Sequence, residues 1–273
     1  MPQQQPDLPI SHSSQKLTTS SAPSNPQTAS PPITASQTSQ WTVESALSSF
    51  PLTPSFKPQP STPIPFFHLL ERLKTTPREG WRRFHIKRPE SIADHMYRMS
   101  IICLVAPDSL ASKINIGHCV QLALVHDMAE SIVGDLIPRQ VEKEEKARRE
   151  GDTMAWIQTQ ALGGVDGGEQ GGRLKKLWEE YEEGKTENAK FVKDVDKLEL
   201  VLQMVEYEKA GEGSVDLGEF LDAKELINGD VCKGWAEELI REREDFWRRL
   251  GKCAKGMEGY VEEKKEEPKE VSE

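Results

Sequence analysis

The stretch LALVHDMAESIVGDL, residues 122–136, places ionisable side chains inside an apolar run. His126 and Asp127 are adjacent, and Glu130 follows the histidine by about one helical turn. Burying an imidazole and two carboxylates among apolar side chains costs free energy unless a partner compensates them. A divalent metal ion is the strongest candidate, because neutral imidazole nitrogens and carboxylate oxygens together suit Mn, Fe, Co, Ni or Zn.

Two further segments carry metal-binding residue types on an apolar helix face. His95 lies in SIADHMYRMSII, with apolar residues at helical spacings around it. The segment KDVDKLEL offers two aspartates. Asp194 has lysines four residues before and three residues after it, which indicates an ion-paired, solvated position. Asp196 lies between Val192 and Leu200, each four residues away, which indicates the inward face and makes it the better ligand candidate.

A site of two histidines and two aspartates has a chemical consequence. In a six-coordinate ion, four protein ligands leave positions open for water and substrate, as a catalytic site requires and a structural site does not. Taken singly, each of these residues could instead be a hydrogen-bonded core residue, and the spacing alone leaves that alternative open. If a metal is bound, the open positions indicate a catalytic rather than a structural centre.

The elements that must position these side chains are all predicted to be helices. Strand-like alternation is absent, and apolar residues recur at helical spacing from Pro65 onward. Ser91 is a predicted N-cap with Asp94 at the third helical position, and the helix through His126 is expected to continue to Gly134. The segment TTPREGWRRFHIKRPE is predicted to be an irregular loop, GGVDGGEQGG a flexible surface linker, and EKEEKARRE a solvated helix with ion pairs between successive turns.

Composition divides the chain into three parts. Residues 1–61 are dominated by Ser, Thr, Pro and Gln and are predicted to be a disordered tail. Within them, WTVESALSSF (41–50) is interpreted as an apolar patch in the tail, with a transient turn or partner motif as the alternative. Residues 62–252 form the predicted all-α domain, and residues 253–273 a charged disordered tail.

Charge and cysteine usage exclude several classes of protein. The formal net charge of −10 argues against binding a nucleic-acid polymer, and no apolar run reaches the ~20 residues of a membrane span. The four cysteines are scattered, as expected for packing residues in a reducing compartment. Residues 1–60 contain no arginine and no apolar signal segment, which argues against mitochondrial import and secretion. A cytoplasmic or nuclear location is expected.

The order of His95, His126 with Asp127, and Asp196 resembles the HD-domain metal-dependent phosphohydrolases. Longer blocks are similar to a group of 5′-deoxynucleotidases, the HD-domain-containing protein 2 and YfbR-like group. These blocks span about residues 64–225 and are RPESIADHMYRM, LALVHDMAESIVGDL, EKARRE, LWEEYE and AKFVKDVDKLELVLQMVEYE.

The resemblance implies a compact HD-domain helical bundle, usually a homodimer, that removes phosphate from deoxyribonucleoside 5′-monophosphates with a divalent metal such as Mn, Co or Mg. It also implies that the ligands of the main metal are His95, His126, Asp127 and Asp196. Glu130 and Asp135 match positions with catalytic or second-cation roles, which the backbone carbonyl of Leu136 would share. Glu130 could take the proton of the attacking water, and Asp135 could protonate the departing 5′-oxygen, position the sugar or bind a cation.

The substrate contacts are predicted in the loop before the first ligand helix. Trp81 matches a tryptophan near the substrate in the group and could stack on the nucleoside, or instead pack the loop onto the core. Bacterial members place an arginine directly before this tryptophan, where this chain has Gly80, so the phosphate-anchoring arginine stays open. The candidates are Arg78, Arg82 and Arg88, since guanidinium groups suit a phosphate dianion.

Other functions use the same four ligand types. The alternatives among enzymes are a dNTP triphosphohydrolase, a cyclic-nucleotide phosphodiesterase and a di-iron oxygenase. The short domain lacks an obvious nucleotide-sensing extension, which favours the monophosphatase. From a different class, the chain could be a non-catalytic adaptor that is stabilised by a metal and recruits partners through its Ser/Pro-rich tail.

Overall fold

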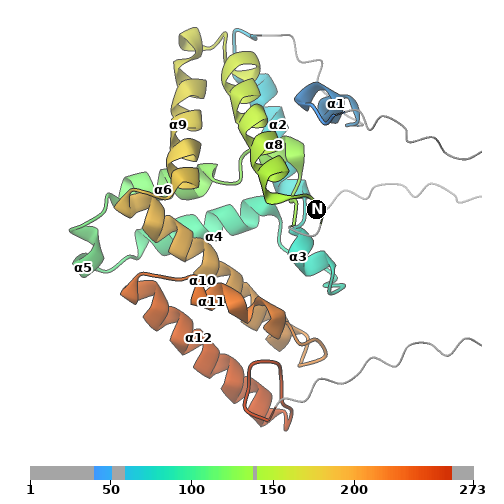
Figure 1. Cartoon of the computed structure of the whole chain (residues 1–273), viewed down its shortest axis with the longest axis vertical. Helices are drawn as coiled ribbons and strands as arrows, with labels where there is room; N and C mark the ends of the chain where they lie inside the picture. Colours follow the sequence, from blue (N-terminus) through green and yellow to red (C-terminus); the bar gives the residue numbers. More distant parts are fainter. Residues whose placement is uncertain (1–39, 51–58, 138–139, 260–273) are drawn as a thin grey trace, which may run out of the picture. The chain divides into compact units, whose positions relative to one another are not determined.

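The computed structural model describes residues 40–50, 59–137 and 140–259, and the regular elements in these ranges are helices (Figure 1). The all-α prediction is confirmed. The α-helices in chain order are α1 (Val43–Ser48), α2 (Ile64–Thr75), α3 (Glu79–Arg82), α4 (Ile92–Leu104), α5 (Asp108–Ala111), α6 (Ile116–Val125), α7 (Glu130–Val133), α8 (Lys143–Trp156), α9 (Glu169–Glu183), α10 (Glu187–Ala210), α11 (Asp222–Glu225) and α12 (Asp230–Arg249). A π-helix, η1 (Ile157–Ala161), continues α8, and short 3-10 helices, η2 (Asp166–Gly168) and η3 (Gly218–Leu221), precede α9 and α11.

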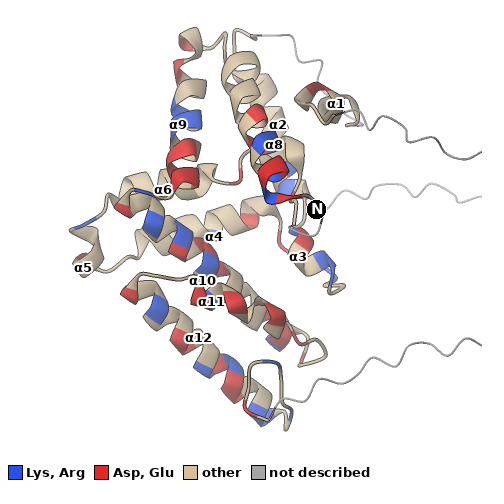
Figure 2. Cartoon of the chain, in the orientation of Figure 1, with Lys and Arg blue, Asp and Glu red and all other residues tan. Residues whose placement is uncertain are grey.

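The central packing involves α4, α6 and α10. Helix α4 packs along α6, and α10 packs against both and also against α9 and α12. Helices α4 and α6 carry few charges, whereas α8, α9 and α12 carry many (Figure 2). The apolar faces meet in one core that includes Met99, Leu122, Val192 and Val195. Because the fully buried α4 and α6 faces are apolar, any ionisable side chain on them must find a partner inside the domain.

Local sequence signals fix the start of α4 as predicted. The Ser91 hydroxyl accepts from the Asp94 backbone N–H at 3.1 Å, and an Asp94 carboxylate oxygen accepts from the Ser91 backbone N–H at 2.8 Å. This reciprocal capping box satisfies two of the unpaired donors at the helix start. The first turn of α4 is therefore rigid, and His95 follows directly after it.

The helix predicted to run through His126 to Gly134 is wrong, because it breaks at the histidine. Helix α6 ends at Val125, and α7 begins at Glu130. Between them the hydrogen bonds tighten to three-residue spacing, with Glu130 N donating to the Asp127 carbonyl at 3.0 Å. Consecutive residues of a regular helix point in different directions, so the tight turn lets the adjacent His126 and Asp127 serve one site.

The folded region begins earlier than the predicted boundary at residue 62. Residues 43–48 form α1, which Thr42 caps, and Val43 and Leu47 are buried in the main core against α7 and α8. The interpretation of 41–50 as a patch in a disordered tail is therefore wrong, since its apolar side chains pack on the domain. The rest of the predicted N-terminal tail, residues 1–39 and 51–58, lies outside the described residues.

The folded region also extends past the predicted C-terminal boundary. Ala254 is buried, and the Lys255 backbone N–H donates to Asp216 at 2.7 Å, so the chain still packs after the predicted boundary at residue 252. Residues 260–273 of the predicted charged tail lie outside the described residues.

Two segments read as irregular contain helix. The loop TTPREGWRRFHIKRPE contains α3, and the last four residues of GGVDGGEQGG begin α9. Gly171 is buried there, and a β-carbon added to it would lie 2.7 Å from the α-carbon of Gln158. The flexible-linker prediction is wrong for these residues, because the glycine allows α9 to approach η1 closely.

Three of the four cysteines are packing residues as predicted, and the fourth is not. Cys103, Cys119 and Cys232 are buried free thiols and Cys253 is an exposed one, so none forms a disulfide. Within the described ranges, no helix has the length and the hydropathy that crossing a membrane would take.

Candidate metal centre

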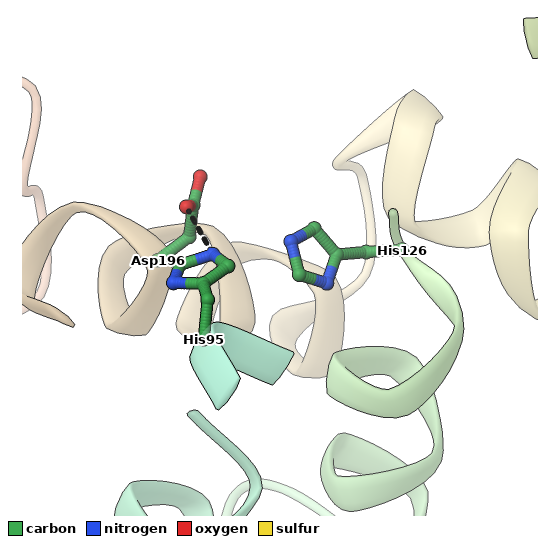
Figure 3. Close-up of side chains that lie close together, drawn as sticks. All are labelled: His95, His126 and Asp196. Carbon is green, nitrogen blue, oxygen red and sulfur yellow. Dashed lines mark ion pairs between the residues drawn. The ribbon is translucent and has the colours of Figure 1, made fainter. Parts of the chain in front are cut away.

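The four predicted ligands lie close together in space. His95 comes from α4, His126 and Asp127 from the turn after α6, and Asp196 from the middle of α10. Figure 3 shows the imidazole of His126 directed toward His95 and Asp196. One ligand atom from each of these three residues lies within 4.8 Å of the others. Asp127 Oδ2 lies 3.1 Å from His126 Nε2 and 4.0 Å from His95 Nε2.

Hydrogen bonds orient both imidazoles with Nε2 toward the centre. His95 Nδ1 lies 2.5 Å from Glu199 Oε2, and His126 Nδ1 lies 2.9 Å from the Ala123 carbonyl oxygen. A carbonyl oxygen and a carboxylate oxygen accept hydrogen bonds, so each Nδ1 carries a hydrogen, and each Nε2 presents a lone pair when its ring is neutral. Both Nε2 atoms are buried without a hydrogen-bond partner among the described residues.

When both rings are neutral, the hydrogen-bond acceptors of this centre face one another. The Nε2 lone pairs face carboxylate oxygens, with His95 Nε2 only 3.3 Å from Asp196 Oδ1. Such an arrangement requires a positive species between the groups, and two imidazole nitrogens with two carboxylates are a donor set that fits a borderline divalent cation. A proton is the alternative. Although burial and Arg78 lower the pKa of His95, Glu199 and Asp196 outweigh them and raise it to about 9.

Both aspartates of the centre are ionised. Burial alone would raise the pKa of Asp127, but His126 and Arg78 hold it well below its usual range. Burial opposes ionisation of Asp196 as well, and Lys197 and His95 keep its pKa low. The Arg78 guanidinium donates to Asp127 at 3.1 Å, and Lys197 Nζ donates to Asp196 at 2.5 Å.

The choice between the two aspartates of α10 can be read from their surroundings. Asp196 faces the centre, where the Tyr181 hydroxyl also donates to it at 3.2 Å. Asp194 is buried, and its carboxylate accepts from the backbone N–H groups of Asn228 and Gly229 at 2.9 and 2.7 Å. The prediction of a solvated, ion-paired Asp194 is wrong, because the segment before α12 packs over it.

Glu130 is buried beside the centre and is not a surface glutamate. Its Oε1 accepts from Lys146 Nζ at 3.2 Å, while Oε2 has no partner among the described residues. Burial raises the pKa of Glu130 well above its usual value, and Asp127 and Asp135 add to the shift that Lys146 partly offsets. A carboxyl group of raised pKa beside the predicted ligands is a candidate for proton transfer.

The three oxygen donors predicted for a second cation already have partners from the chain. The Leu136 carbonyl accepts from Lys146 Nζ at 3.1 Å, and Asp135 Oδ2 accepts from the Glu79 backbone N–H at 2.5 Å. The ammonium of Lys146 thus lies between Glu130 and Leu136. The fully solvated interpretation of EKEEKARRE is wrong for this lysine, which points inward from α8.

The three predicted substrate residues occupy different positions. Arg78 reaches the centre through Asp127. Arg82 is 58% exposed and pairs with Glu79, so it is not brought to the centre. Trp81 is 1% exposed, packs against Tyr207 and Phe220, and donates from Nε1 to Glu90. Its burial favours the packing interpretation over a stacking contact with a nucleoside.

Arg88 lines a groove on the surface. It is exposed, and the groove, of about 500 Å³, is also lined by Tyr97, Arg98 and Tyr207. Of the three candidate arginines, Arg78 is the one that the structure places beside a predicted ligand.

Sequence reasoning missed Glu199, Tyr181 and Lys146. Glu199 follows Asp196 by three residues, a spacing that places both on one helix face, and this signal was present in the sequence. Tyr181 and Lys146 lie on other helices, and only the packing of α9 and α8 brings them to the site.

The domain is all-helical and brings two histidines and two aspartates together. Two of the imidazole nitrogens have no hydrogen-bond partner among the described residues, and this combination is typical of a metalloprotein. Residues 70–233 match the HD domain, and the chain belongs to the HD-domain family.

The relatives carry consistent names. The chain is 49% identical to the 5′-deoxynucleotidase hdd1 of Schizosaccharomyces pombe over 67% of this chain and 91% of that protein. It is 45% identical to the human 5′-deoxynucleotidase HDDC2 over 59% of this chain and 75% of that protein.

Solved structures share the fold. The HD domain-containing protein YGK1 aligns with a TM-score of 0.54 at 29% identity, covering 76% of this chain and 94% of its own. The PH0347 protein of Pyrococcus horikoshii aligns with a TM-score of 0.53 at 28% identity, covering 67% and 99%.

Proposed function

We propose that this chain is a metal-dependent 5′-deoxynucleotidase, which hydrolyses deoxyribonucleoside 5′-monophosphates to deoxynucleosides and phosphate. The observation that carries the proposal is the pair of buried Nε2 atoms that face Asp196 and Asp127 and have no hydrogen-bond partner among the described residues. Relatives of up to 49% identity are named 5′-deoxynucleotidases, which supports the choice of substrate.

The residues that would hold the divalent ion are His95, His126, Asp127 and Asp196. An ion bound there would supply Lewis acidity toward a phosphoryl oxygen and a bound water of lowered pKa. The two imidazole ligands favour Mn or Co over Mg and also accommodate Fe, Ni or Zn.

The chain's own residues bind the phosphate and move protons. The Arg78 guanidinium is the candidate anchor, because it is largely buried beside Asp127 and has donors suited to phosphate oxygens. In the reaction a water oxygen forms the new bond to phosphorus, and the bond from phosphorus to the 5′-oxygen breaks. Glu130, in its ionised form, would take a proton of that water at Oε2, which has no partner among the described residues. Because burial raises the pKa of Glu130, the protonated carboxyl could then give this proton to the departing 5′-oxygen.

Asp135 and Lys146 would have different roles in the site. The Glu79 N–H holds Asp135 near the α7 terminus, where its carboxylate could position the sugar or the leaving oxygen. Lys146 joins Glu130 to the Leu136 carbonyl and so fixes the side of the centre on which Glu130 stands. A second cation would have to displace this ammonium.

We also propose a homodimer in the cytoplasm or nucleus. Helix α4 exposes a row of apolar side chains at helical spacing, Tyr97, Ile101 and Leu104, and its C-cap residue Val105 is exposed beside them. A contiguous exposed apolar row is typical of an interaction surface. Light scattering after size-exclusion chromatography would test the dimer, and a monomer at micromolar concentration would contradict it.

The test of the function compares three substrates in one assay. Chromatography of products from dGMP, dGTP and a cyclic nucleotide, with Mn or Co, should show deoxyguanosine and phosphate from dGMP. Release of tripolyphosphate from dGTP would instead support the triphosphohydrolase. Asp127→Ala should abolish release from dGMP, and Asp245→Ala on the exposed face of α12 should not. Unchanged turnover in Asp127→Ala would refute the mechanism.

A further inference from the structure

We propose that Glu199, held by Arg98, is a positioning residue that sets the tautomer and the basicity of His95. The proposal rests on the proposed metal centre, because it assigns His95 Nε2 as the ligand atom. The geometry of α4 and α10 points to this role.

One helix supplies a partner to each nitrogen of the same imidazole. Asp196 and Glu199 are three residues apart on α10, so both carboxylates face α4. Asp196 Oδ1 lies 3.3 Å from His95 Nε2, and Glu199 Oε2 lies 2.5 Å from His95 Nδ1. The imidazole is thus held between two carboxylates, one on the metal side and one behind it.

The buried carboxylate of Glu199 requires partners that compensate its charge. Its side chain is 0% exposed, and an unpaired buried carboxylate would be costly. Its two oxygens contact His95 Nδ1 and the Arg98 guanidinium, which compensates the buried charge. The carboxylate accepts the Nδ1 hydrogen, so Nε2 is the ring nitrogen that is directed at the centre.

Arg98 holds the other oxygen of Glu199. Arg98 lies three residues after His95 on α4, and its Nε donates to Glu199 Oε1 at 2.8 Å. The same guanidinium donates to Gln203 and Glu206 on the next turns of α10, each at 2.6 Å. Its side chain is 26% exposed. A series of charge-assisted hydrogen bonds therefore runs from His95 to the surface of α10.

The expected consequence is a gain in metal affinity. A carboxylate behind a ligating histidine fixes the ring and makes Nε2 a better donor, and losing such a partner typically weakens metal binding by about 10- to 100-fold. A purely structural Glu199, which only joined α4 to α10, would affect stability and leave metal affinity unchanged.

The experiment compares Glu199→Leu, Glu199→Gln and the matched control Glu206→Gln. Glu206 also lies on α10 and bonds to Arg98, but it does not touch His95. Titration calorimetry with Mn²⁺ on EDTA-treated full-length protein should show about 10- to 100-fold weaker binding for Glu199→Leu. Glu199→Gln keeps an acceptor oxygen and should fall between Glu199→Leu and the wild type. Glu206→Gln should stay within about twofold of the wild type, as expected for an exposed pair.

A second measurement reads the tautomer without metal. Nitrogen chemical shifts of the His95 ring in the metal-free protein, recorded above its pKa of about 9 where the ring is neutral, should report hydrogen on Nδ1 in the wild type. They should report a mixture of tautomers in Glu199→Leu. Wild-type Mn²⁺ affinity together with a wild-type tautomer in Glu199→Leu would overturn the proposal. An equal loss in Glu206→Gln would also overturn it. Absence of Mn²⁺ binding by the wild-type protein would defeat the proposed function instead, and the tautomer measurement would still decide on Glu199.

Discussion

Helix α10 carries two buried ionic clusters, which differ in whether their polar atoms have hydrogen-bond partners. Near its C-terminal end, Glu208 is fully buried and joins α12, where Arg243 donates to both of its oxygens at 2.7 and 2.9 Å. Trp247 Nε1 and the Leu217 N–H donate to the same carboxylate at 2.7 and 2.8 Å. Arg243 also donates to Asp216 at 3.1 Å. The carboxylate is saturated with donors.

The metal centre near the middle of α10 is incomplete by comparison. The Nε2 atoms of His95 and His126 have no hydrogen-bond partner among the described residues, and they face carboxylates that are also acceptors. Buried polar groups in folded proteins are normally satisfied, so a cluster of unsatisfied acceptors of like type marks a place for a ligand. The first cluster joins two helices, whereas the second is built to hold a cation.

The largest expected effect concerns the saturated cluster. Arg243→Met leaves the buried Glu208 without its cation, and breaking a buried pair typically costs about 3–5 kcal/mol of unfolding free energy. Urea unfolding measures this loss, and Mn²⁺ affinity below the transition should not change. Arg248→Met, on the exposed face of the same helix, should cost less than about 0.5 kcal/mol. A large drop in Mn²⁺ affinity in Arg243→Met would contradict the separation of the two clusters.

The metal centre should show the reverse behaviour. Asp196→Asn should lower phosphate release from dGMP by at least about 100-fold, because it removes a direct ligand rather than an outer partner. A smaller loss of unfolding free energy is expected for the metal-free protein, because Lys197 and the Tyr181 hydroxyl lose an ionised acceptor.

Asp194→Asn is the matched variant two residues away. It weakens the acceptors for two backbone N–H groups and should cost about 1–3 kcal/mol while turnover stays near that of the wild type. If Asp194→Asn and Asp196→Asn behaved alike in both assays, the division of roles between them would be wrong.

Lys146 donates to a buried carboxyl group beside the metal centre, and so combines features of the two clusters. Lys146→Met removes the ammonium from the buried Glu130 and the Leu136 carbonyl and should cost about 1–3 kcal/mol. Denaturant unfolding of the metal-free protein is the measurement. Lys143→Met, an exposed lysine of the same helix, should change stability by less than about 0.5 kcal/mol. Equal stability of the two variants would show that Glu130 does not need this partner.

The smallest expected effect is local and lies beside the centre. Ser91→Ala removes the N-cap of α4 and should cost about 1 kcal/mol. Mn²⁺ affinity should remain near that of the wild type, because the Glu199 contact continues to orient His95. Thermal unfolding and calorimetry measure the two quantities. An affinity loss larger than that of Glu199→Leu would indicate that the cap, rather than Glu199, positions the histidine.

Much of the site could be predicted because its signals are local. An ionisable residue among apolar ones at helical spacing indicates burial, so His95 and Asp196 could be assigned to inward helix faces from their neighbours within one turn. The capping box of Ser91 and Asp94 is equally local, and the structure contains it. Asp194 was misjudged because its partners, the backbone N–H groups of Asn228 and Gly229, are more than thirty residues away.

The sequence by itself determined that the domain is helical and that metal-binding residue types lie on apolar faces. Only the tertiary structure decided that the helix breaks after Val125, that α1 belongs to the core, and that Trp81 is buried. It also decided that Lys146 and Glu199 are partners of the site. The physical reason is that helical spacing shows which face of a helix is buried, whereas the packing of distant elements decides which atoms meet there.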